Sequence, residues 1–154
     1  MIKVLFVCLG NICRSPMAEF IFKDIINKNG LSNKFIIKSA ATSYEESGND
    51  TYYLAKEKLE EKNIPMNKRK ATRITTDDYK NYDYIIGMEE SNIRNIVRIV
   101  GADIDNKISK LLDYSNNPRD IADPWYTGNF EIAYNDILEG CNAFLDYLIN
   151  KGRI

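Results

Sequence analysis

Apolar runs and amphipathic segments alternate along the chain, and this order predicts the fold class. Four short runs are apolar enough to form buried strands, and the segments between them repeat apolar side chains at helical spacing. Strands that alternate with helices favour right-handed crossovers and a parallel sheet. The predicted strands are residues 2–7, 35–39, 84–88 and 108–112, and the predicted helices are residues 16–28, 51–62, 89–100 and 130–148.

Local signals mark the ends of the first predicted helix. Ser15 is a typical N-cap residue, and Pro16 suits the first helical position because its missing N–H would have no partner there. Asn29-Gly30 is a plausible stop. We therefore expect an α/β protein with one domain over residues 1–154, in which helices flank the sheet in three layers.

The composition excludes several functions. The 21 basic and 22 acidic residues nearly balance, so bulk charge makes no case for nucleic acid or an anionic membrane. No apolar run approaches membrane-spanning length, and residues 1–3 lead into a strand rather than a signal peptide, so we expect a cytoplasmic protein.

Three cysteines argue against a disulfide framework. The absence of histidine excludes a Ser-His-Asp triad, a papain-like Cys-His pair and His-ligated zinc.

The candidate chemistry lies in the loop from Cys8 to Ser15, at the carboxyl end of the first predicted strand. A short loop that opens into a helix can turn its backbone N–H groups inward and form an anion nest. Gly10 and Asn11 tolerate the backbone conformations that this requires, and Arg14 offers a planar fork for two phosphate oxygens. The pKa of a free cysteine is about 8.5, and such surroundings can lower it to roughly 3.5–7.5. We therefore expect a thiolate nucleophile that needs no histidine.

The sequence Cys8-Leu9-Gly10-Asn11-Ile12-Cys13-Arg14-Ser15-Pro16-Met17-Ala18-Glu19 resembles the active-site motif of the low-molecular-weight protein tyrosine phosphatases. The resemblance covers essentially the whole chain, because residues 39–42, 83–88 and 123–126 match further family motifs in the expected order. It implies the phosphotyrosine protein phosphatase I-like fold, with four parallel strands in the order 2-1-3-4. It also implies hydrolysis of phosphotyrosine and small aryl phosphates through a phosphocysteine, without a metal or other cofactor. The expected partners are phosphotyrosine proteins as substrates and inorganic phosphate or other oxyanions as inhibitors, and the expected state is a monomer.

The resemblance also assigns roles within the site. Cys8 would be the nucleophile, Arg14 would bind the phosphate, and Asp123 would act as the general acid and then as the general base. Asn11 would shape the loop, and Ser15 would donate a hydrogen bond to the thiolate. The other residues expected at the phosphate or the substrate ring are Leu9, Gly10, Ile12, Cys13, Trp125 and Tyr126.

The sequence leaves two interpretations open for Cys13 and gives Cys141 a structural one. Cys13 either forms a reversible disulfide with Cys8 or simply packs within the loop. Cys141 falls on the apolar face of the last predicted helix, so we expect it in the core.

One departure from the family pattern concerns the support of the loop. The family usually has a histidine before an Ala-Arg-Gln stretch, and this histidine joins the hydrogen bonds behind the loop; here this chain has Arg69-Lys70-Ala71-Thr72-Arg73. We interpret the basic cluster of Lys68, Arg69, Lys70 and Arg73 as a solvated face, with attraction of acidic residues beside a phosphotyrosine as the alternative.

Three other functions are weighed against a tyrosine phosphatase. An arsenate reductase of the same fold passes a disulfide through further cysteines after the third strand, and residues 80–100 contain none. A phosphoarginine phosphatase tends to have threonine where this chain has Ile12. A phosphate-binding module without catalysis would need neither the nucleophile Cys8 nor the acid Asp123.

Overall fold

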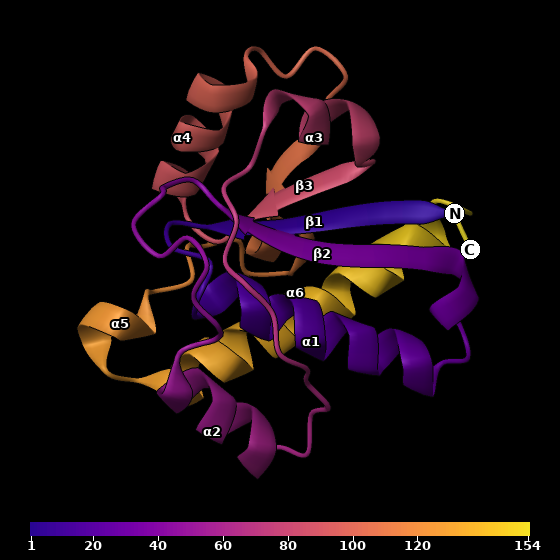
Figure 1. Cartoon of the computed structure of the whole chain (residues 1–154). Coiled ribbons are helices and arrows are strands. Elements are labelled where there is room, and N and C mark those ends of the chain that lie inside the picture. Colours follow the sequence, from indigo (N-terminus) through magenta and orange to yellow (C-terminus); the bar gives the residue numbers. More distant parts are fainter.

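A four-stranded parallel sheet divides the molecule into layers (Figure 1). The computed structural model describes residues 1–154. The strand order β2-β1-β3-β4 confirms the predicted order 2-1-3-4. The strands are β1 (Ile2–Cys8), β2 (Phe35–Ala41), β3 (Tyr84–Gly87) and β4 (Ile108–Lys110).

Helices cover both faces of the sheet, as predicted (Figure 1). The short α5 lies instead beyond the carboxyl ends of the strands. The first face carries α1 (Arg14–Lys28), α2 (Tyr53–Glu61) and α6 (Phe130–Asn150), the second carries α3 (Thr76–Asn81) and α4 (Glu90–Val100), and α5 is Pro124–Thr127. Two single 3-10 turns are η1 (Ser32–Lys34) and η2 (Leu111–Tyr114).

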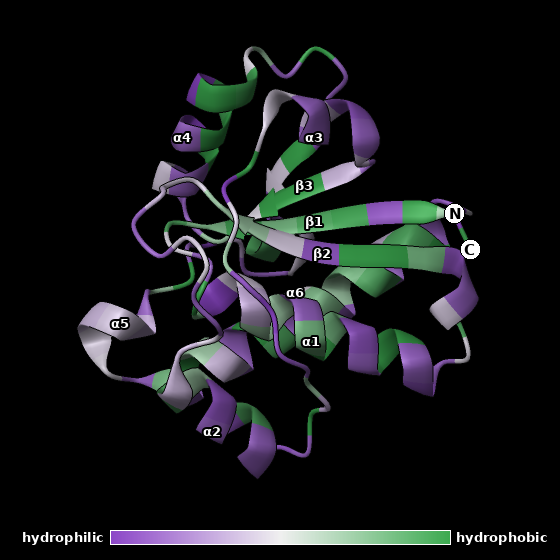
Figure 2. Cartoon of the chain, viewed as in Figure 1, coloured by the Kyte–Doolittle hydropathy of each residue, from purple (hydrophilic) through white to green (hydrophobic).

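Side chains of β1 alternate between two cores. Val4, Phe6 and Cys8 belong to the larger core, which packs under α1 and α6. Leu5 and Val7 belong to the smaller core, which packs under α3 and α4. Because both faces of β1 are covered, its sequence is almost continuously apolar. Figure 2 shows β1 and β3 coloured as hydrophobic along most of their length, whereas α2 is mostly hydrophilic.

The start of α1 differs from the prediction. The helix begins at Arg14, so Cys13 is the N-cap, and its side chain makes no capping hydrogen bond. Ser15 is therefore not the N-cap; its hydroxyl instead lies 3.1 Å from the Cys8 sulfur. Pro16 sits two positions later than predicted but remains in the first turn, where its missing N–H has no helical partner.

Other boundaries follow from local hydrogen bonds. α1 ends at Lys28 with Asn29 as its C-cap, as predicted, and Gly30 follows in the left-handed region at φ 69°. The fourth strand ends at Lys110 instead of residue 112, because Lys110 N donates to Asp113 Oδ2 at 3.0 Å and starts the turn η2. The short helices α3 and α5 were not predicted, and each begins at a side-chain cap, Thr75 for α3 and an aspartate described below for α5.

The carboxyl ends of the strands bring distant segments together. Cys8 at the end of β1 pairs with Ala41 at the end of β2, and Val7 pairs with Gly87 at the end of β3. Residues 71–74 also reach this edge, because Ile74 N donates to Ala41 O at 2.8 Å. The segments that follow each strand therefore surround the loop after Cys8.

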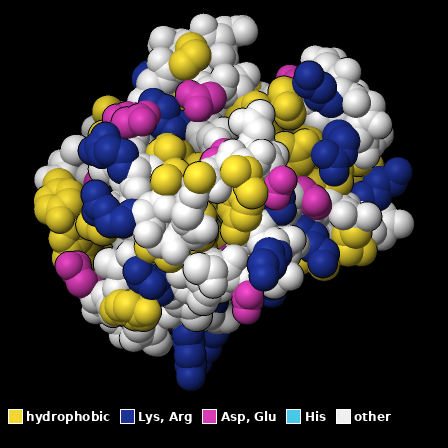
Figure 3. Space-filling model, turned by 90° about the horizontal axis from the view of Figure 1, so that it is seen from above, with side chains coloured by type: hydrophobic (Ala, Val, Ile, Leu, Met, Phe, Trp, Pro, Cys, Tyr) yellow, Lys and Arg dark blue, Asp and Glu magenta, His cyan; other side chains and the backbone are white.

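The surface carries both signs of charge. Figure 3 shows basic and acidic side chains interspersed on the face seen from above. None of the helices combines the length and the apolar character that crossing a bilayer requires.

Close packing of α6 against η2 gives a prediction for stability. A Cβ at Gly140 would lie 2.4 Å from Leu111 Cγ, which is shorter than real contacts. Alanine normally stabilises a helix by about 1 kcal/mol relative to glycine. In Gly140→Ala we expect overpacking to outweigh this gain and to lower the free energy of unfolding by about 1–3 kcal/mol.

Urea denaturation measures this difference, with Asn142→Ala on the exposed side of the same helix as the control. The control should stay within about 0.5 kcal/mol of the wild type. A G140A protein as stable as the wild type would contradict the close contact between α6 and η2.

Candidate active site

Cys8 opens a tight loop that leads from β1 into α1, and we call residues 8–15 the Cys8 loop. The Cys8 side chain is only 3% exposed, but it borders a cavity of about 120 Å³. The cavity lies at the carboxyl ends of the strands, where ligands of parallel α/β sheets bind. Within the loop, Asn11 adopts the left-handed conformation at φ 59° that its sequence suggested.

The backbone of the Cys8 loop is turned so that its N–H groups remain free. Carbonyl groups of the loop accept hydrogen bonds from neighbouring backbone N–H groups, whereas the N–H groups of residues 9–13 donate to no protein acceptor. A run of free N–H groups at a helix N-terminus is an anion-binding nest. The carbonyl bonds are Thr42 N to Cys8 O (3.0 Å), Ser43 N to Leu9 O (3.1 Å), Tyr52 N to Ile12 O (2.8 Å) and Met17 N to Cys13 O (3.1 Å).

Arg14 connects this loop to the far side of the cavity. Its side chain is 1% exposed, and a buried guanidinium needs acceptors for its N–H groups. Nη1 donates to Ile121 O at 2.8 Å. Nη2 donates to Asp123 Oδ2 at 3.2 Å and to Glu89 Oε1 at 3.4 Å. The cation is thus held by the Ile121 carbonyl while it faces the carboxylates of Glu89 and Asp123.

The two oxygens of Asp123 have different partners. Oδ1 accepts from Trp125 N at 3.0 Å and caps α5, and Oδ2 faces Arg14. The segment before it is anchored to the sheet, because Ile121 N donates to Met88 O at 2.9 Å. This anchor explains how a residue far along the chain comes to the Cys8 loop.

The structure brings the predicted site residues together. Three of them are buried: Asn11 bonds Ser15 and Ser15 bonds Cys8 within the loop, and Arg14 reaches Asp123 on the cavity wall. The others border a single cavity: Cys8, Leu9, Gly10, Ile12, Cys13, Asp123, Trp125 and Tyr126.

Aromatic side chains form one wall of the cavity. Trp125 is 50% exposed and Tyr126 is 76% exposed. The Trp125 ring packs edge-on against Tyr52, with 4.8 Å between ring centroids, and Tyr52 stacks on Phe130 of α6. The wall is therefore braced from behind while its own rings stay available to a ligand.

Four charged residues at the site were not predicted. Glu45 and Glu46 border the cavity, although the sequence places them in an ordinary polar loop. Glu89 binds Arg14, and no motif marked it. Arg69 was interpreted as part of a solvated face, and this is wrong, because its guanidinium donates to Asn11 behind the loop. The family histidine position was the one signal that pointed to Arg69.

The other residues of the basic cluster agree better with the predicted solvated face. Lys68 and Lys70 are exposed. Arg73 lies with its guanidinium 4.6 Å from the centre of the Tyr44 ring and donates to the Tyr44 hydroxyl at 3.2 Å.

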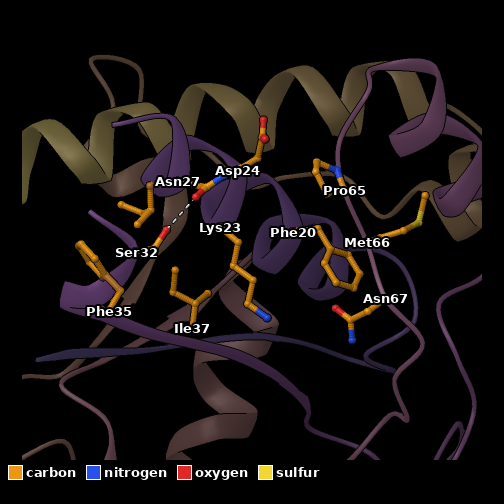
Figure 4. Close-up of a pocket in the computed structure, with 11 residues that line it drawn as sticks. Phe20, Lys23, Asp24, Asn27, Ser32, Phe35, Ile37, Pro65, Met66 and Asn67 are labelled. Atoms are coloured by element: carbon orange, nitrogen blue, oxygen red, sulfur yellow. Dashed lines mark hydrogen bonds between the residues drawn. The ribbon is translucent and has the colours of Figure 1, made fainter. Parts of the chain in front are cut away.

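A second cavity, of about 440 Å³, lies between α1, the start of β2 and residues 65–67 (Figure 4). It is at the opposite end of the sheet, because Phe35 on its wall pairs with Ile2 and not with Cys8. Its one basic side chain, Lys23, is already paired with Glu19 at 2.5 Å. No nucleophile faces an anion nest there. No group of three or more His, Cys, Asp or Glu side chains that could hold a metal ion forms in the chain.

The fold and the cavity define an α/β protein with a cysteine in a loop of free backbone N–H groups, and comparisons with known proteins identify its family. The sequence model of the family described as low molecular weight phosphotyrosine protein phosphatase matches residues 3–153. The chain therefore belongs to the low molecular weight phosphotyrosine protein phosphatase family.

Individual relatives cover nearly the whole chain. The low molecular weight protein-tyrosine-phosphatase YfkJ of Bacillus subtilis is 41% identical, over 94% of both chains. Its crystal structure superposes with a TM-score of 0.94 over 98% of this chain and 96% of that one. The low molecular weight phosphotyrosine protein phosphatase of Gallus gallus is 40% identical over 94% of both chains. A structure described as DARP, drosophila arginine phosphatase, is 30% identical, with a TM-score of 0.86 over 95% and 97%.

The three cysteines should differ in reactivity. Burial, reinforced by the nearby charges of Cys8 and Asp123, raises the pKa of the Cys13 thiol well above its usual value. Burial alone raises the pKa of Cys141 in the same direction. A raised pKa keeps a thiol protonated at pH 7, and the thiolate is the reactive form. Iodoacetamide at pH 7 should therefore alkylate Cys8 and spare Cys13 and Cys141.

Peptide mass spectrometry after a short exposure reads the sites of labelling. In the urea-unfolded protein, the control, all three cysteines should react. Labelling of Cys13 in the folded protein at pH 7 as fast as Cys8 would contradict the burial of its thiol.

Proposed function

We propose that this chain is a protein tyrosine phosphatase that hydrolyses phosphotyrosine and small aryl phosphates through a phosphocysteine on Cys8. The observation that carries this proposal is the free backbone N–H groups of residues 9–13, in the loop through which Cys8 borders the cavity. Asp123 lies across the same cavity, so a nucleophile and a proton donor flank one anion site. The named activity of the relatives supports this assignment.

The first step transfers the phosphoryl group to sulfur. Cys8 Sγ attacks phosphorus, and the bond from phosphorus to the aryl oxygen breaks with its electron pair on oxygen. Asp123, in its protonated form, gives that oxygen a proton so that it leaves as a neutral phenol. The free N–H groups of the loop and the Arg14 guanidinium stabilise the charge on the equatorial oxygens.

The second step returns the enzyme to its starting state. Asp123, now a carboxylate, takes a proton from a water molecule as the water oxygen attacks phosphorus. The bond between sulfur and phosphorus breaks, and the electron pair stays on the Cys8 thiolate. Inorganic phosphate is the second product, so phosphate and similar oxyanions should inhibit by occupying the same loop.

The walls of the cavity favour an aromatic phosphate on a protein. The rings of Trp125 and Tyr126 can pack against a phenyl ring, and both are largely exposed at the mouth. Proteins that carry phosphotyrosine are therefore the substrates we propose.

One observation favours a second candidate, a phosphoarginine phosphatase. Glu45 and Glu46 add two carboxylates to the cavity, and a guanidinium attached to the phosphate would complement them. The likeness to the structure described as an arginine phosphatase points in the same direction. Two other functions are less well supported. An arsenate reductase needs a further mobile cysteine, and the remaining one, Cys141, is buried on α6. A pure binding module does not explain Asp123.

A leaving-group comparison tests the general acid. Asp123→Asn keeps a side-chain oxygen to cap α5 but has no proton to give. For phenyl phosphate or a phosphotyrosine peptide, whose oxygen is a poor leaving group, we expect kcat/KM to fall by about 10²–10⁴-fold. For p-nitrophenyl phosphate, whose oxygen leaves readily as an anion, the loss should be far smaller.

The ratio kcat/KM is the appropriate measure because it reports the steps up to the first bond cleavage. Asp120→Asn is the control, because Asp120 is an exposed carboxylate in the segment that precedes Asp123. This substitution should not change kcat/KM appreciably for either substrate. Equal slowing of both substrates by D123N would show that Asp123 is not the general acid.

Matched phosphotyrosine and phosphoarginine peptides distinguish the two candidate substrates. We expect the phosphotyrosine peptide to have the higher kcat/KM in the wild type. Glu45→Gln with Glu46→Gln should raise this preference further, because it removes charge that favours a guanidinium. A higher kcat/KM for phosphoarginine in the wild type would replace the first proposal with the second.

A further inference from the structure

Arg69 is held firmly behind the Cys8 loop. Its Nη2 donates to the Asn11 backbone oxygen at 2.7 Å and also to Asn11 Oδ1. Nη1 donates to Thr51 Oγ1 at 3.3 Å, and the Arg69 backbone N donates to Asp50 Oδ1 at 3.2 Å. The guanidinium is therefore fixed on one side by residues 50–51 and presents the other side to Asn11.

The donor-only character of arginine fixes how the Asn11 amide is turned. Arginine has no acceptor, so the atom of Asn11 that faces it must be the oxygen Oδ1. Thr72 N donates to the same oxygen at 3.3 Å. The amide nitrogen Nδ2 must then point the other way, and it donates to Ser15 Oγ at 2.7 Å.

This orientation decides what the Ser15 hydroxyl can do. Because Ser15 Oγ accepts from Asn11, its single hydrogen remains available to donate. Two acceptors are within reach, Cys8 Sγ at 3.1 Å and Ala40 O at 3.4 Å. The sulfur is the closer one, and a thiolate is the stronger acceptor because it is charged. Ser15 N, at 3.4 Å from the sulfur, adds a second donor.

We propose that Arg69 is a positioning residue that sets the direction of the hydrogen-bond chain Arg69–Asn11–Ser15–Cys8. The chain ends with the Ser15 hydrogen on the sulfur, where it stabilises the thiolate as it leaves phosphorus in the second step. This proposal rests on the phosphatase function proposed above. Arginine stays protonated across the physiological pH range, so the direction of the chain does not depend on pH. A histidine in its place can donate or accept, depending on its tautomer and charge.

Coupling between Arg69 and Ser15 tests the proposal. Arg69→Met removes every donor at nearly the same length, and we expect kcat for p-nitrophenyl phosphate to fall about 10-fold, the size expected for one hydrogen bond to a charged group. Lys70→Met is the matched control, because it removes a neighbouring exposed charge, and it should leave kcat within about twofold. In a Ser15→Ala background the chain is already cut, so R69M should then lower kcat by no more than about twofold.

A second readout needs no phosphatase activity. The rate of Cys8 alkylation by iodoacetamide rises with pH, and R69M should move its midpoint to higher pH in the protein that keeps Ser15 but not in the S15A protein. Circular dichroism confirms that each variant is folded. If R69M does not fold, Arg69→Lys takes its place and should give an intermediate loss of kcat, because one ammonium reaches fewer acceptors than the guanidinium fork.

The outcomes separate this proposal from the proposed function. If the wild type hydrolyses aryl phosphates and R69M matches it in both readouts, the role of Arg69 is refuted and the phosphatase assignment stands. If R69M lowers kcat by the same factor in the wild-type and S15A backgrounds, Arg69 only shapes the loop and the proposal fails. If the wild type hydrolyses no aryl phosphate, the proposed tyrosine phosphatase function fails, while the alkylation readout still decides the role of Arg69.

Discussion

The site depends on one constraint: the backbone N–H groups of residues 9–13 must face inward and remain unpaired. Free N–H groups cost energy unless an anion or solvent meets them, so the loop cannot hold this shape by itself. Everything around it supplies the missing support. The loop carbonyls are bound by residues after β2 and before α2, and Asn11 takes the left-handed conformation with its side chain fully buried. The conformation of the Cys8 loop thus depends on the tertiary fold.

Two cations near the Cys8 loop complement the negative charge of the proposed phosphate. Arg69 lies behind the loop and Arg14 reaches across to Asp123, and each is held by acceptors from a different part of the chain. Arg14 is also the physical link between the two halves of the site, since it bonds the Ile121 carbonyl and the Asp123 carboxylate. The proposed binding of a dianion therefore needs no basic surface on a chain with nearly balanced charge, because buried cations act over short distances.

Local patterns were enough to predict the α/β class, its parallel sheet and the place of the Cys8 loop, whereas the strand order came from the family resemblance. Alternation of buried runs and amphipathic segments predicted a parallel sheet, and the short spacing from Cys8 to Arg14 predicted the loop. Asp123 could be placed at the same edge because order along the chain fixes which strand it follows. Prediction failed where tertiary contacts compete with local ones. Ser15 is an ideal N-cap by sequence, but its hydroxyl is committed to Cys8.

The same limit applies to the charged residues that were missed. Arg69 has the same local composition as Lys68 and Lys70, and only the pairing of residues 71–74 with the end of β2 brings it to Asn11. Glu89 is marked by no motif, and its contact with Arg14 depends on how α4 starts after β3. Contacts between segments that are distant in the sequence decide whether a charged side chain is solvated or structural. The pattern of residues along the chain does not contain these contacts.

The central claim is that the free N–H groups of the Cys8 loop bind phosphate, and amide NMR tests it most directly. In the ¹⁵N-labelled wild-type protein titrated with inorganic phosphate, the amide resonances of residues 9–13 should shift together and saturate with one Kd. Resonances of the exposed Lys68 and Lys70 should stay in place. Shifts confined to those lysines, or loop resonances that do not respond, would contradict the account.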